Sequence, residues 1–301
     1  MDKTKLVRGA FLRSAITREP MPAELQNALT FTKGANPGGP LLPVEVSTTL
    51  IEDIYGEDAF LEHVTHTQIK GLRLPKVTAA PVADAVRMPN ADAGETELTD
   101  AIITFGRFPG REKILVPGTI MRGTDTDLDS YITRRLNRDH RARMKERIFA
   151  ETPAGDFAHM GVYATGEGNP GIVVKTGETI LEAIQAAIAD LPEGVRENAA
   201  VVMPYADWMT LIQTLANGAA TLFGRPTKEM LGFEVVTCDY VKASKGYLVG
   251  DLSTIHINYD DPLRMETDRD INLDMDLTVI GYDYDIQVED ANCLRLAKVG
   301  A

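Results

Sequence analysis

One glycine-rich stretch of this chain has the spelling of a nucleotide-binding site. Gly166, Gly168 and Gly171 follow the pattern in which glycines open a helix and backbone N–H groups hold a pyrophosphate. In this sequence Pro170 stands inside the pattern and the β-branched residues 172–174 follow it, so the stretch leads into a strand. We therefore interpret residues 166–171 as a loop and expect no cofactor to bind there.

Three alternating aspartates have the spacing that begins a calcium-binding loop. They are Asp125, Asp127 and Asp129. Such a loop also needs glycine at its sixth position and glutamate at its twelfth, where this chain has Ser130 and Leu136. We expect the aspartates instead to start a helix, with Thr126 and Asp129 as a capping box and the carboxylates at the positive end of the helix dipole.

The histidines and serines show no arrangement typical of a metal centre or a nucleophile. His63 and His66 have a His-x-x-His spacing, but no further carboxylate or thiol is placed to complete a set of metal ligands. The other three histidines are isolated from one another: His140, His159 and His256. There is no Gly-x-Ser-x-Gly elbow and no Cys–His arrangement. The sequence therefore predicts no catalytic, cofactor-binding or metal-binding residues, and no enzyme activity.

The two cysteines, Cys238 and Cys293, lie in apolar surroundings. Buried, reduced thiols are the expected state of such residues, which fits a cytoplasmic compartment. The first 20 residues lack the apolar core of a secretory signal. No apolar run reaches the roughly 18 residues of a membrane helix, so no membrane partner is expected.

The charge of the chain is segregated along the sequence. The 301 residues carry a net charge of −13, and 44% of them are hydrophobic. Residues 1–40 hold six Lys/Arg against three Asp/Glu and residues 131–150 hold seven against two, whereas residues 251–290 hold two against twelve. Overall acidity argues against a dedicated nucleic-acid-binding protein. The segregation is typical of a subunit with one basic and one acidic surface, and separate solvated faces would also produce it.

The basic charge in the middle of the chain falls on a predicted long helix. Apolar residues recur there at steps of three and four: Leu128, Tyr131, Ile132, Leu136, Met144, Ile148 and Phe149. This spacing predicts one apolar stripe on a helix of about 33 Å at 1.5 Å per residue. Between Asn137 and Arg143 the helix is polar on all sides, so we expect solvent or a partner there. Pro153 and Gly155 end the helix.

The segments before this helix predict an arm, a shorter helix and a set of strands. Residues 1–40 mix weak helix signals with breakers, which predicts a flexible arm or linker. A helix is expected after Pro43, with one apolar face: Val46, Leu50, Ile51 and Ile54. Strands are expected at 68–77, 100–105 and 111–118. Little continuous apolar sequence lies between them, so residues 66–117 are interpreted as a β excursion from the body, or as a hairpin lying on a core.

The second half of the chain predicts an α/β unit followed by long strands. We expect strands at 171–174, 199–204, 233–241 and 245–252, and helices at 178–191 and 205–217. Trp208 stands at helical spacing with three apolar residues, which predicts a place in the core: Leu211, Ile212 and Leu215. Residues 271–279 alternate like a half-buried strand. After Gly281 the apolar set shifts to Tyr282 and Tyr284, so a β-bulge or bend is expected at this glycine.

The order of these elements resembles the major capsid protein family of tailed bacteriophages, which has the Hong Kong 97-like fold. Three blocks within residues 41–301 carry the resemblance: LLPVEVSTTLIEDI; ITFGRF with ILVPGTIMRGTDTDLDSYITRRLNRDHRARMKERIF; and AAVVMPYADWMTLIQTLANGAATLFGRPTKEMLGFEVVTCDYV with GYLVGDLSTIHINYDDPLRMETDRD. The resemblance implies an α+β fold in six parts. These are an N-terminal arm (1–40), the start of a peripheral domain (41–65), an extended β arm or E-loop (66–117), the peripheral domain with its spine helix at 125–150 (118–170), an axial domain (171–258) and return strands of the peripheral domain (259–301).

The function that the resemblance implies is mechanical. Copies of the chain would form pentamers and hexamers of an icosahedral shell around packaged double-stranded DNA, assembled in the host cytoplasm and present in the virion. Portal and other head proteins would be partners. DNA would be contacted without sequence specificity, and the candidates for facing it are five arginines of the spine helix: Arg134, Arg135, Arg138, Arg141 and Arg143. The acidic residues 251–290 would meet basic surfaces at subunit contacts or form outer surface.

Two departures from the family pattern limit what the resemblance carries over. The prototype has a scaffolding domain before its shell domain, whereas this chain has only residues 1–40 there, so a separate scaffolding protein is implied, or none. The prototype also cross-links its subunits through an arm lysine and an asparagine, assisted by a glutamate. The matching positions here are Arg107, Met275 and Tyr282, so no cross-link is expected, although Lys113 and Asn272 lie close by in the sequence.

Two other functions are compatible with the sequence. An encapsulin-type nanocompartment that stores proteins shares the fold, and a soluble cytoplasmic α/β enzyme belongs to a different class. The arms at 1–40 and 66–117 favour the phage shell over the nanocompartment. DNA rather than a cargo enzyme inside particles would separate these two, and a small oligomer in place of shells would indicate the enzyme.

Overall fold

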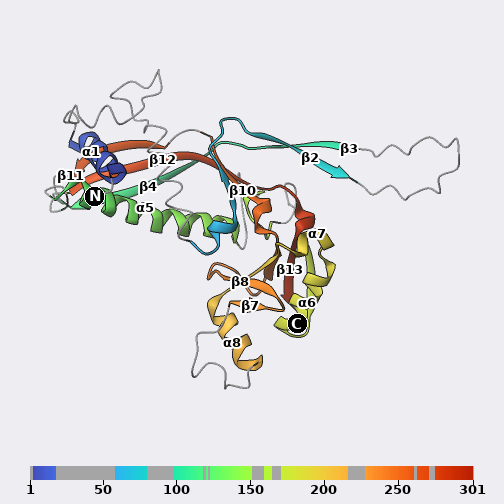
Figure 1. Ribbon diagram of the computed structural model, residues 1–301. Coiled ribbons are helices and arrows are strands. Elements are labelled where there is room, and N and C mark those ends of the chain that lie inside the picture. The colour runs from blue at the N-terminus through green and yellow to red at the C-terminus, as the bar shows by residue number, and fades with distance from the viewer. Residues whose placement is uncertain are drawn as a thin grey trace.

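The computed structural model describes most of the chain in separate stretches. The described residues are 3–17, 58–79, 98–117, 120, 123–150, 159–164, 171–215, 228–260, 263–270 and 275–300. They form a five-stranded sheet, a six-stranded sheet and a two-stranded hairpin, with one long helix under the five-stranded sheet (Figure 1). Within these stretches no helix is long and apolar enough to cross a membrane.

The five-stranded sheet is built around one long strand, β12 (Met275–Val288). One edge of β12 pairs antiparallel with β4 (Phe108–Pro117). Its other edge pairs with β11 (Arg264–Asp270) and then with β10 (Ile255–Tyr259). The short strand β1 (Thr65–Thr67) adds to β10 in parallel. A single strand therefore connects all the elements of this sheet.

β12 runs through Gly281 without the expected bulge. Its pairing with β4 advances one residue at a time from Ile280 through Gly281 to Tyr282. Even-numbered side chains are buried on both sides of the glycine, and the odd-numbered Leu277 and Val279 are half-buried on the opposite face. The bulge was wrongly predicted because both faces of this part of the sheet are partly covered, so apolar residues occur in both phases of the strand. The alternative, a bend at Gly281, stays a prediction.

The long helix α5 (Asp125–Ile148) lies along one face of this sheet, beside β4 and β12 (Figure 1). The predicted apolar stripe is confirmed, since six of its members are buried: Leu128, Ile132, Leu136, Met144, Ile148 and Phe149. Tyr131 is half-buried, and its hydroxyl donates a hydrogen bond to the carbonyl of Leu115 on β4 at 3.0 Å. The helix is therefore fixed to the sheet along its whole length.

The cap of α5 lies two residues before its predicted position. Thr124 is the N-cap: its hydroxyl accepts a hydrogen bond from the N–H of Asp127, and the carboxylate of Asp127 accepts one from the N–H of Thr124. The sequence contains two overlapping Thr-x-x-Asp pairs. The second pair, Thr126 and Asp129, does not form the cap, because Asp129 is buried in an ion pair with Arg8.

An N-terminal helix, α1 (Lys3–Thr17), packs across α5 and reaches β11. Gly9 stands at the closest approach, where an added Cβ would lie 2.0 Å from the carbonyl oxygen of Asp125. Val7 and Leu12 are buried in the contact. Residues 3–17 are therefore a docked helix, and the expectation of a flexible arm was wrong for them. The rest of the arm to residue 40, and the helix expected after Pro43, lie outside the described residues.

A two-stranded hairpin projects away from the five-stranded sheet (Figure 1). It consists of β2 (Arg73–Ala79) and β3 (Leu98–Thr104), paired antiparallel. Strands were predicted here and at β4, and all three are found. The projecting segment is shorter than the predicted range 66–117, because the strands at its two ends, β1 and β4, belong to the five-stranded sheet. β4 belongs to this sheet because it pairs with β12. The sequence of β4 alone does not reveal that pairing, because β12 lies far along the chain.

The six-stranded sheet has the order β5-β13-β9-β6-β8-β7. Its strands are β5 (Val173–Gly177), β6 (Ala200–Met203), β7 (Glu229–Met230), β8 (Phe233–Thr237), β9 (Tyr247–Gly250) and β13 (Leu294–Val299). Helices α6 (Ile180–Asp190), α7 (Glu193–Arg196) and α8 (Tyr205–Leu215) belong to the same unit. Trp208, Leu211 and Ile212 of α8 are buried, as predicted, whereas the side chain of Leu215 lies outside the described residues.

Two strands lie in a different sheet from the neighbouring strands of their predicted range. β13 was assigned to the return strands at 259–301, but it lies between β5 and β9 in the six-stranded sheet. β10, which begins at Ile255 inside the predicted axial part, pairs with β12 in the five-stranded sheet. The sequence pattern identifies each strand but not its sheet, because membership depends on pairing between segments far apart in the chain.

Candidate functional site: the basic face of helix α5

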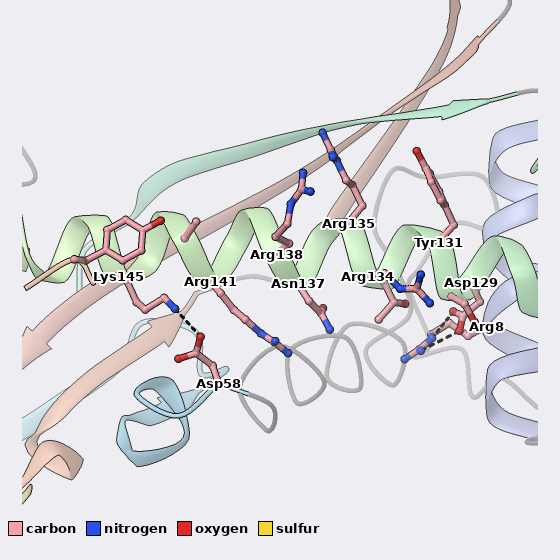
Figure 2. A pocket seen from close by; sticks show the side chains of 14 residues that line it. Arg8, Asp58, Asp129, Tyr131, Arg134, Arg135, Asn137, Arg138, Arg141 and Lys145 are labelled. Carbon is pink, nitrogen blue, oxygen red and sulfur yellow. Dashed lines mark hydrogen bonds and ion pairs between the residues drawn. The ribbon is translucent and has the colours of Figure 1, made fainter. Parts of the chain in front are cut away.

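A groove runs along α5, and five of the fourteen residues that line it are arginines. We call it the basic groove; its volume is about 930 Å³, and Arg8, Asp58 and Tyr240 complete its lining. Four of the five predicted arginines line it: Arg134, Arg135, Arg138 and Arg141. Figure 2 shows Arg135 and Arg138 extending to one side of the helix and Arg141 to the other.

Exposed positive charge predominates along the middle of the groove. Arg134, Arg135 and Arg138 are exposed, and Arg141 is half-buried. One carboxylate, Asp139, is shared between Arg135 (Nε–Oδ2 3.3 Å) and Arg138 (Nε–Oδ1 3.1 Å). Ion pairs in such exposed positions are weak and are screened by salt. The groove can therefore attract an anionic partner without a defined pocket for it.

Each end of the basic groove is closed by an ion pair within the subunit. At one end the Arg8 guanidinium donates to both oxygens of Asp129, at 2.6 and 3.0 Å, and both side chains are buried. At the other end Lys145 Nζ lies 2.7 Å from Asp58 Oδ2 (Figure 2). Burial alone would raise the pKa of Asp58, but the hydrogen bonds from Lys145 and from backbone N–H groups outweigh it and lower this pKa.

The fifth predicted arginine lies elsewhere. Arg143 is half-buried, and its Nη1 donates a hydrogen bond to the carbonyl of Arg111 on β4 at 2.7 Å. It does not line the basic groove. The structure thus separates Arg143, which contacts β4, from the four arginines that line the basic groove.

A buried polar cluster lies where α5 faces the sheet. His140 Nδ1 is 3.0 Å from Glu112 Oε1, and His140 Nε2 is 2.6 Å from the hydroxyl of Tyr259. Tyr282 donates its hydroxyl proton to the same Glu112 oxygen at 2.9 Å. Burial, followed by the nearby charge of Glu112, raises the pKa of Tyr282. All four side chains are buried, so this cluster joins α5, β4, β10 and β12 and offers no open site to a substrate.

The expectation that the polar middle of α5 faces solvent or a partner holds for Arg138, which is exposed, but not for two of its polar residues. Asn137 and His140 are both buried. The sequence did carry a signal, because His140 lies four residues from both Leu136 and Met144 and therefore on the apolar stripe. Its polarity concealed this position, and its partners Glu112 and Tyr259 are distant in the sequence.

A second polar cluster, not expected from the sequence, holds the entry to the β2–β3 hairpin. His256 Nε2 lies 2.7 Å from the hydroxyl of Thr67. Asn258 accepts from that hydroxyl at 2.8 Å and donates its amide to the carbonyl of Ile69 at 2.9 Å. Asp260 accepts from the N–H of Gly71 at 2.6 Å. The alternation of His256, Asn258 and Asp260 on and just after β10 places all three on one face.

The return from the hairpin is held in the same way. Arg107 Nε lies 2.5 Å from Asp260 Oδ2. The N–H of Gly106 donates to Asp285 Oδ2 at 2.7 Å, and His159 Nε2 lies 2.6 Å from Asp285 Oδ1. Asp260 and Asp285 are both buried. Both connections of the hairpin are thus bonded to β10 and β12, which fixes the direction in which the hairpin leaves the sheet.

At least half of the acidic residues in 251–290 are used inside the subunit. Asp260 and Asp283 form ion pairs with arginines, and Asp285 and Glu289 contact His159 and His256. Two cap short helices, namely η3 (Leu252–Thr254) and η4 (Ala291–Cys293): Asp251 and Asp290. This segment is therefore less available for contacts with other subunits than its net charge predicts.

Three residues stand at the positions that match the cross-linking residues of the prototype. Arg107 is paired with Asp260, Tyr282 is buried under α5, and Met275 is half-buried at the start of β12. Lys113 is exposed on β4, and Asn272 lies outside the described residues. The absence of a covalent cross-link stays a prediction.

The other candidate residues do not come together. Among the described residues, no three His, Cys, Asp or Glu side chains form a group that could hold a metal ion. His66 is exposed, and His63 Nε2 lies 3.8 Å from Glu234. Cys238 and Cys293 are free thiols whose pKa burial raises to about 11, which makes them poor nucleophiles at neutral pH. Residues 166–170 lie outside the described residues.

Comparison with known proteins gives a consistent result. The sequence matches the model of the phage capsid family over residues 38–299. No curated protein sequence matches significantly. The fold is similar to the capsid of an empty GTA particle (TM-score 0.57, 14% identity, 81% of this chain and 90% of that chain).

Two further structures cover nearly the whole chain. One is of Microbacterium phage Oxtober96, with a TM-score of 0.57, 10% identity and coverage of 93% of this chain and 100% of that chain. The other is the satellite phage P4 procapsid, which includes a size determination protein, with a TM-score of 0.52, 16% identity and coverage of 94% and 98%. At these identities the likeness establishes the fold, and the α+β capsid architecture expected from the resemblance is confirmed.

Proposed function

Because this chain belongs to the phage capsid family, we propose that its copies enclose the packaged double-stranded DNA of a tailed bacteriophage. The chain is a capsid shell protein that associates with itself and is located in the virion capsid. DNA as the content and a tailed phage as the source are the proposed part. The observation that supports DNA as the content is the basic groove on α5.

The groove matters because the chain as a whole is acidic. A net charge of −13 per copy would repel DNA packed against the inner surface of a shell. The four arginines of the basic groove would place local positive charge against phosphates and reduce this repulsion. Their exposure, without a shaped pocket that could read bases, suits contact that is independent of sequence.

The parts of the family fold can be assigned to the observed elements as part of this proposal. The five-stranded sheet with α5 would be the peripheral domain and its spine helix, the six-stranded sheet the axial domain, and the β2–β3 hairpin the E-loop. A separate scaffolding protein, a portal and other head proteins would be further partners, and assembly would take place in the host cytoplasm. The protein would have no enzymatic role.

Binding to DNA can be tested through its salt dependence. The variant Arg134→Gln/Arg135→Gln/Arg138→Gln removes three exposed charges of the groove. We expect unassembled subunits of this variant to bind a double-stranded fragment with a shallower slope of log K against log salt. The slope should fall by roughly 0.9 for each phosphate that is no longer neutralised. The matched control is Arg196→Gln, whose guanidinium bonds to carbonyls of Leu191 and Ala189 in the other unit. An unchanged slope in the triple variant would argue against the groove as a DNA-facing surface.

The content of purified particles tests the other part of the proposal. Shells that hold DNA support the phage function. Shells that hold a cargo protein and no DNA would indicate the encapsulin-type nanocompartment that shares this fold. A small soluble oligomer in place of shells would indicate an α/β enzyme.

A further inference from the structure

The turn between β7 and β8 contains a bulky residue in an unfavourable backbone conformation. Leu231 has a φ of 54°, in the left-handed region that favours Gly, Asn and Asp, and Gly232 follows with a φ of 83°. The Leu231 side chain is 51% exposed, so no packing within the described part of the subunit compensates for this conformation. Strain at an exposed apolar residue is a mark of a contact made elsewhere.

The same hairpin carries a second unfavourable feature. Glu229 on β7 and Glu234 on β8 are directly opposite each other in the antiparallel pair, and both are exposed. Like charges in this position destabilise a hairpin. Glu234 also lines a cleft with two other carboxylates, those of Glu197 and Asp251, and with His63, whose Nε2 lies 3.8 Å from Glu234. A partner that relieves both features must bring apolar surface and positive charge.

The opposite edge of the same sheet has these properties. β5 forms this edge, and among the described strands it pairs only with β13. Its Val173 and Val174 are exposed by 42% and 47%, which is unusual for an edge strand without a cover. Lys298 on β13, which pairs with Thr176, is exposed on the same face of the sheet as Val174, and Lys175 is about one-third exposed.

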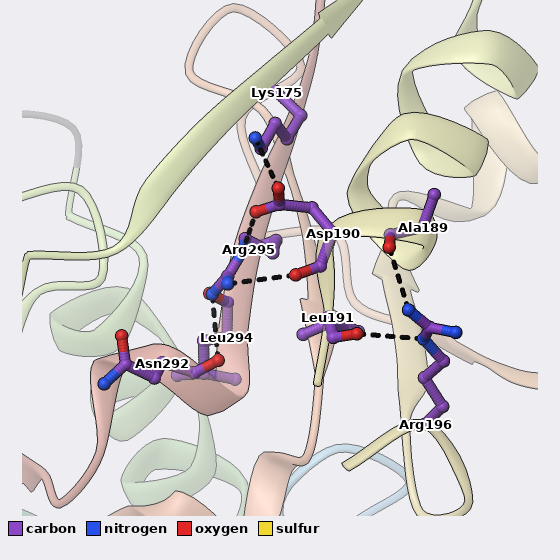
Figure 3. Close-up of polar contacts among 8 residues, drawn as sticks. All are labelled: Lys175, Ala189, Asp190, Leu191, Arg196, Asn292, Leu294 and Arg295. Atoms are coloured by element: carbon purple, nitrogen blue, oxygen red, sulfur yellow. Dashed lines mark hydrogen bonds and ion pairs between the residues drawn. The ribbon is translucent and has the colours of Figure 1, made fainter. Parts of the chain in front are cut away.

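This edge is rigid before any partner arrives. Asp190 at the end of α6 accepts hydrogen bonds from Lys175 Nζ at 2.6 Å and from Arg295 Nε at 2.7 Å. Arg295 also donates to the carbonyls of Asn292 and Leu294 (Figure 3). The hydrogen bonds from Lys175 and Arg295 lower the pKa of Asp190, so the cluster stays charged at neutral pH. A preformed surface needs little ordering when it binds.

We propose that copies of this chain contact one another head to tail, with the β7–β8 hairpin of one copy on the β5–β13 edge of the next. Leu231 would pack against Val174, and the glutamates of the hairpin would face Lys298 on the same side of the sheet. The two surfaces lie on opposite edges of one sheet, so a copy cannot satisfy its own hairpin. A head-to-tail contact repeated around an axis closes a ring. The inference rests on the shell function and specifies which surfaces form the rings of that shell.

Substitution of Leu231 separates the stability of the subunit from its assembly. Leu231→Asn suits the positive φ, so the isolated subunit should unfold at an equal or higher urea concentration. The same variant removes the apolar side chain, and we expect the concentration needed for half-assembly to rise about tenfold in sedimentation velocity. Leu231→Met keeps both the strain and the apolar character and should assemble within about twofold of the wild type. Equal assembly of all three proteins would overturn the inference.

Charge reversal identifies the two surfaces as partners. Glu234→Lys makes both edges basic and Lys298→Glu makes both acidic, so each variant alone should form rings at least about tenfold less well. A mixture of the two should recover alternating hexamers, and the double variant in one chain should also assemble. Two misfolded chains could not rescue each other, so the mixture decides the matter even if a single variant is unstable. If the wild type forms shells but the mixed variants do not recover assembly, the proposed contact is refuted and the shell function is retained. If the wild type forms no shells, both are refuted.

Discussion

The two sheet units of this subunit are stabilised in different ways. Eleven polar or charged side chains are buried among the described residues, and ten of them belong to the five-stranded sheet with α1 and α5. In the six-stranded unit only Arg295 is of this kind, and the core consists of apolar residues such as Val201, Val202 and Leu248. Hydrogen bonds and ion pairs depend on direction, whereas apolar contacts depend mainly on volume. The polar contacts of the first unit therefore fix the angles between its elements, including the direction of the β2–β3 hairpin. The apolar core of the second unit stabilises the six-stranded sheet, whose two edges are the proposed contact surfaces.

The largest difference between the two units should follow removal of the buried ion pair between α1 and α5. Asp129→Ala leaves the Arg8 guanidinium buried without its partner, which is expected to lower the free energy of unfolding by about 3–5 kcal/mol. Urea unfolding of unassembled subunits measures this change.

The matched control replaces both members of the pair. Arg8→Met/Asp129→Leu removes the two charges together, so its destabilisation should be much smaller than that of Asp129→Ala. If the single and double variants were equally destabilised, helix α1 would be held by its apolar residues and the contrast between the two units would be weaker.

The buried cluster around His140 gives the next test. His140→Leu is close in size, but it leaves Glu112 and the hydroxyl of Tyr259 with one partner fewer. We expect the loss of these two contacts to lower the free energy of unfolding by about 1–3 kcal/mol. In the six-stranded unit the comparable change Leu248→Met should cost less than about 1.5 kcal/mol, because it conserves volume in an apolar core. Equal decreases in urea unfolding would contradict the proposed division.

The cap of α5 provides a smaller test, and one that distinguishes the structure from the sequence pattern. Thr124→Ala removes the hydroxyl that accepts from Asp127 and should cost about 1 kcal/mol. Thr126→Ala alters the residue that the sequence pattern favours and should change stability by less than about 0.5 kcal/mol. The reverse order in thermal unfolding would place the cap at Thr126.

The smallest expected effect concerns the polar rim of the six-stranded unit. Because hydrogen bonds from Lys175 and Arg295 lower the pKa of Asp190 below its ordinary 3.8, its contribution to stability is present above that pH and is lost as pH falls through the lowered value. Asp190→Asn should therefore have a lower melting temperature than the wild type near neutral pH, with a gap that narrows as the pH falls below 3.8. A gap independent of pH would show that the charge of Asp190 is not involved.

Periodic patterns in the sequence predicted the elements of both units, but not the polar contacts of the first. The stripe from Leu128 to Phe149 and the core position of Trp208 follow from spacing alone. Helix α1 was missed because its Arg8 looks like a surface residue until Asp129, 121 positions later, is placed beside it. β13 was assigned to the wrong sheet for the same reason, since its partners lie far away in the chain. Buried polar partners of this kind are decided by tertiary pairing.

An electron cryomicroscopy reconstruction of particles assembled from the full chain tests the central claim most directly. We predict a closed icosahedral shell in which the basic groove of α5, with Arg134, Arg135 and Arg138, faces the interior. A preparation that contains only small open oligomers, or a shell whose arginines face outward, would contradict the account.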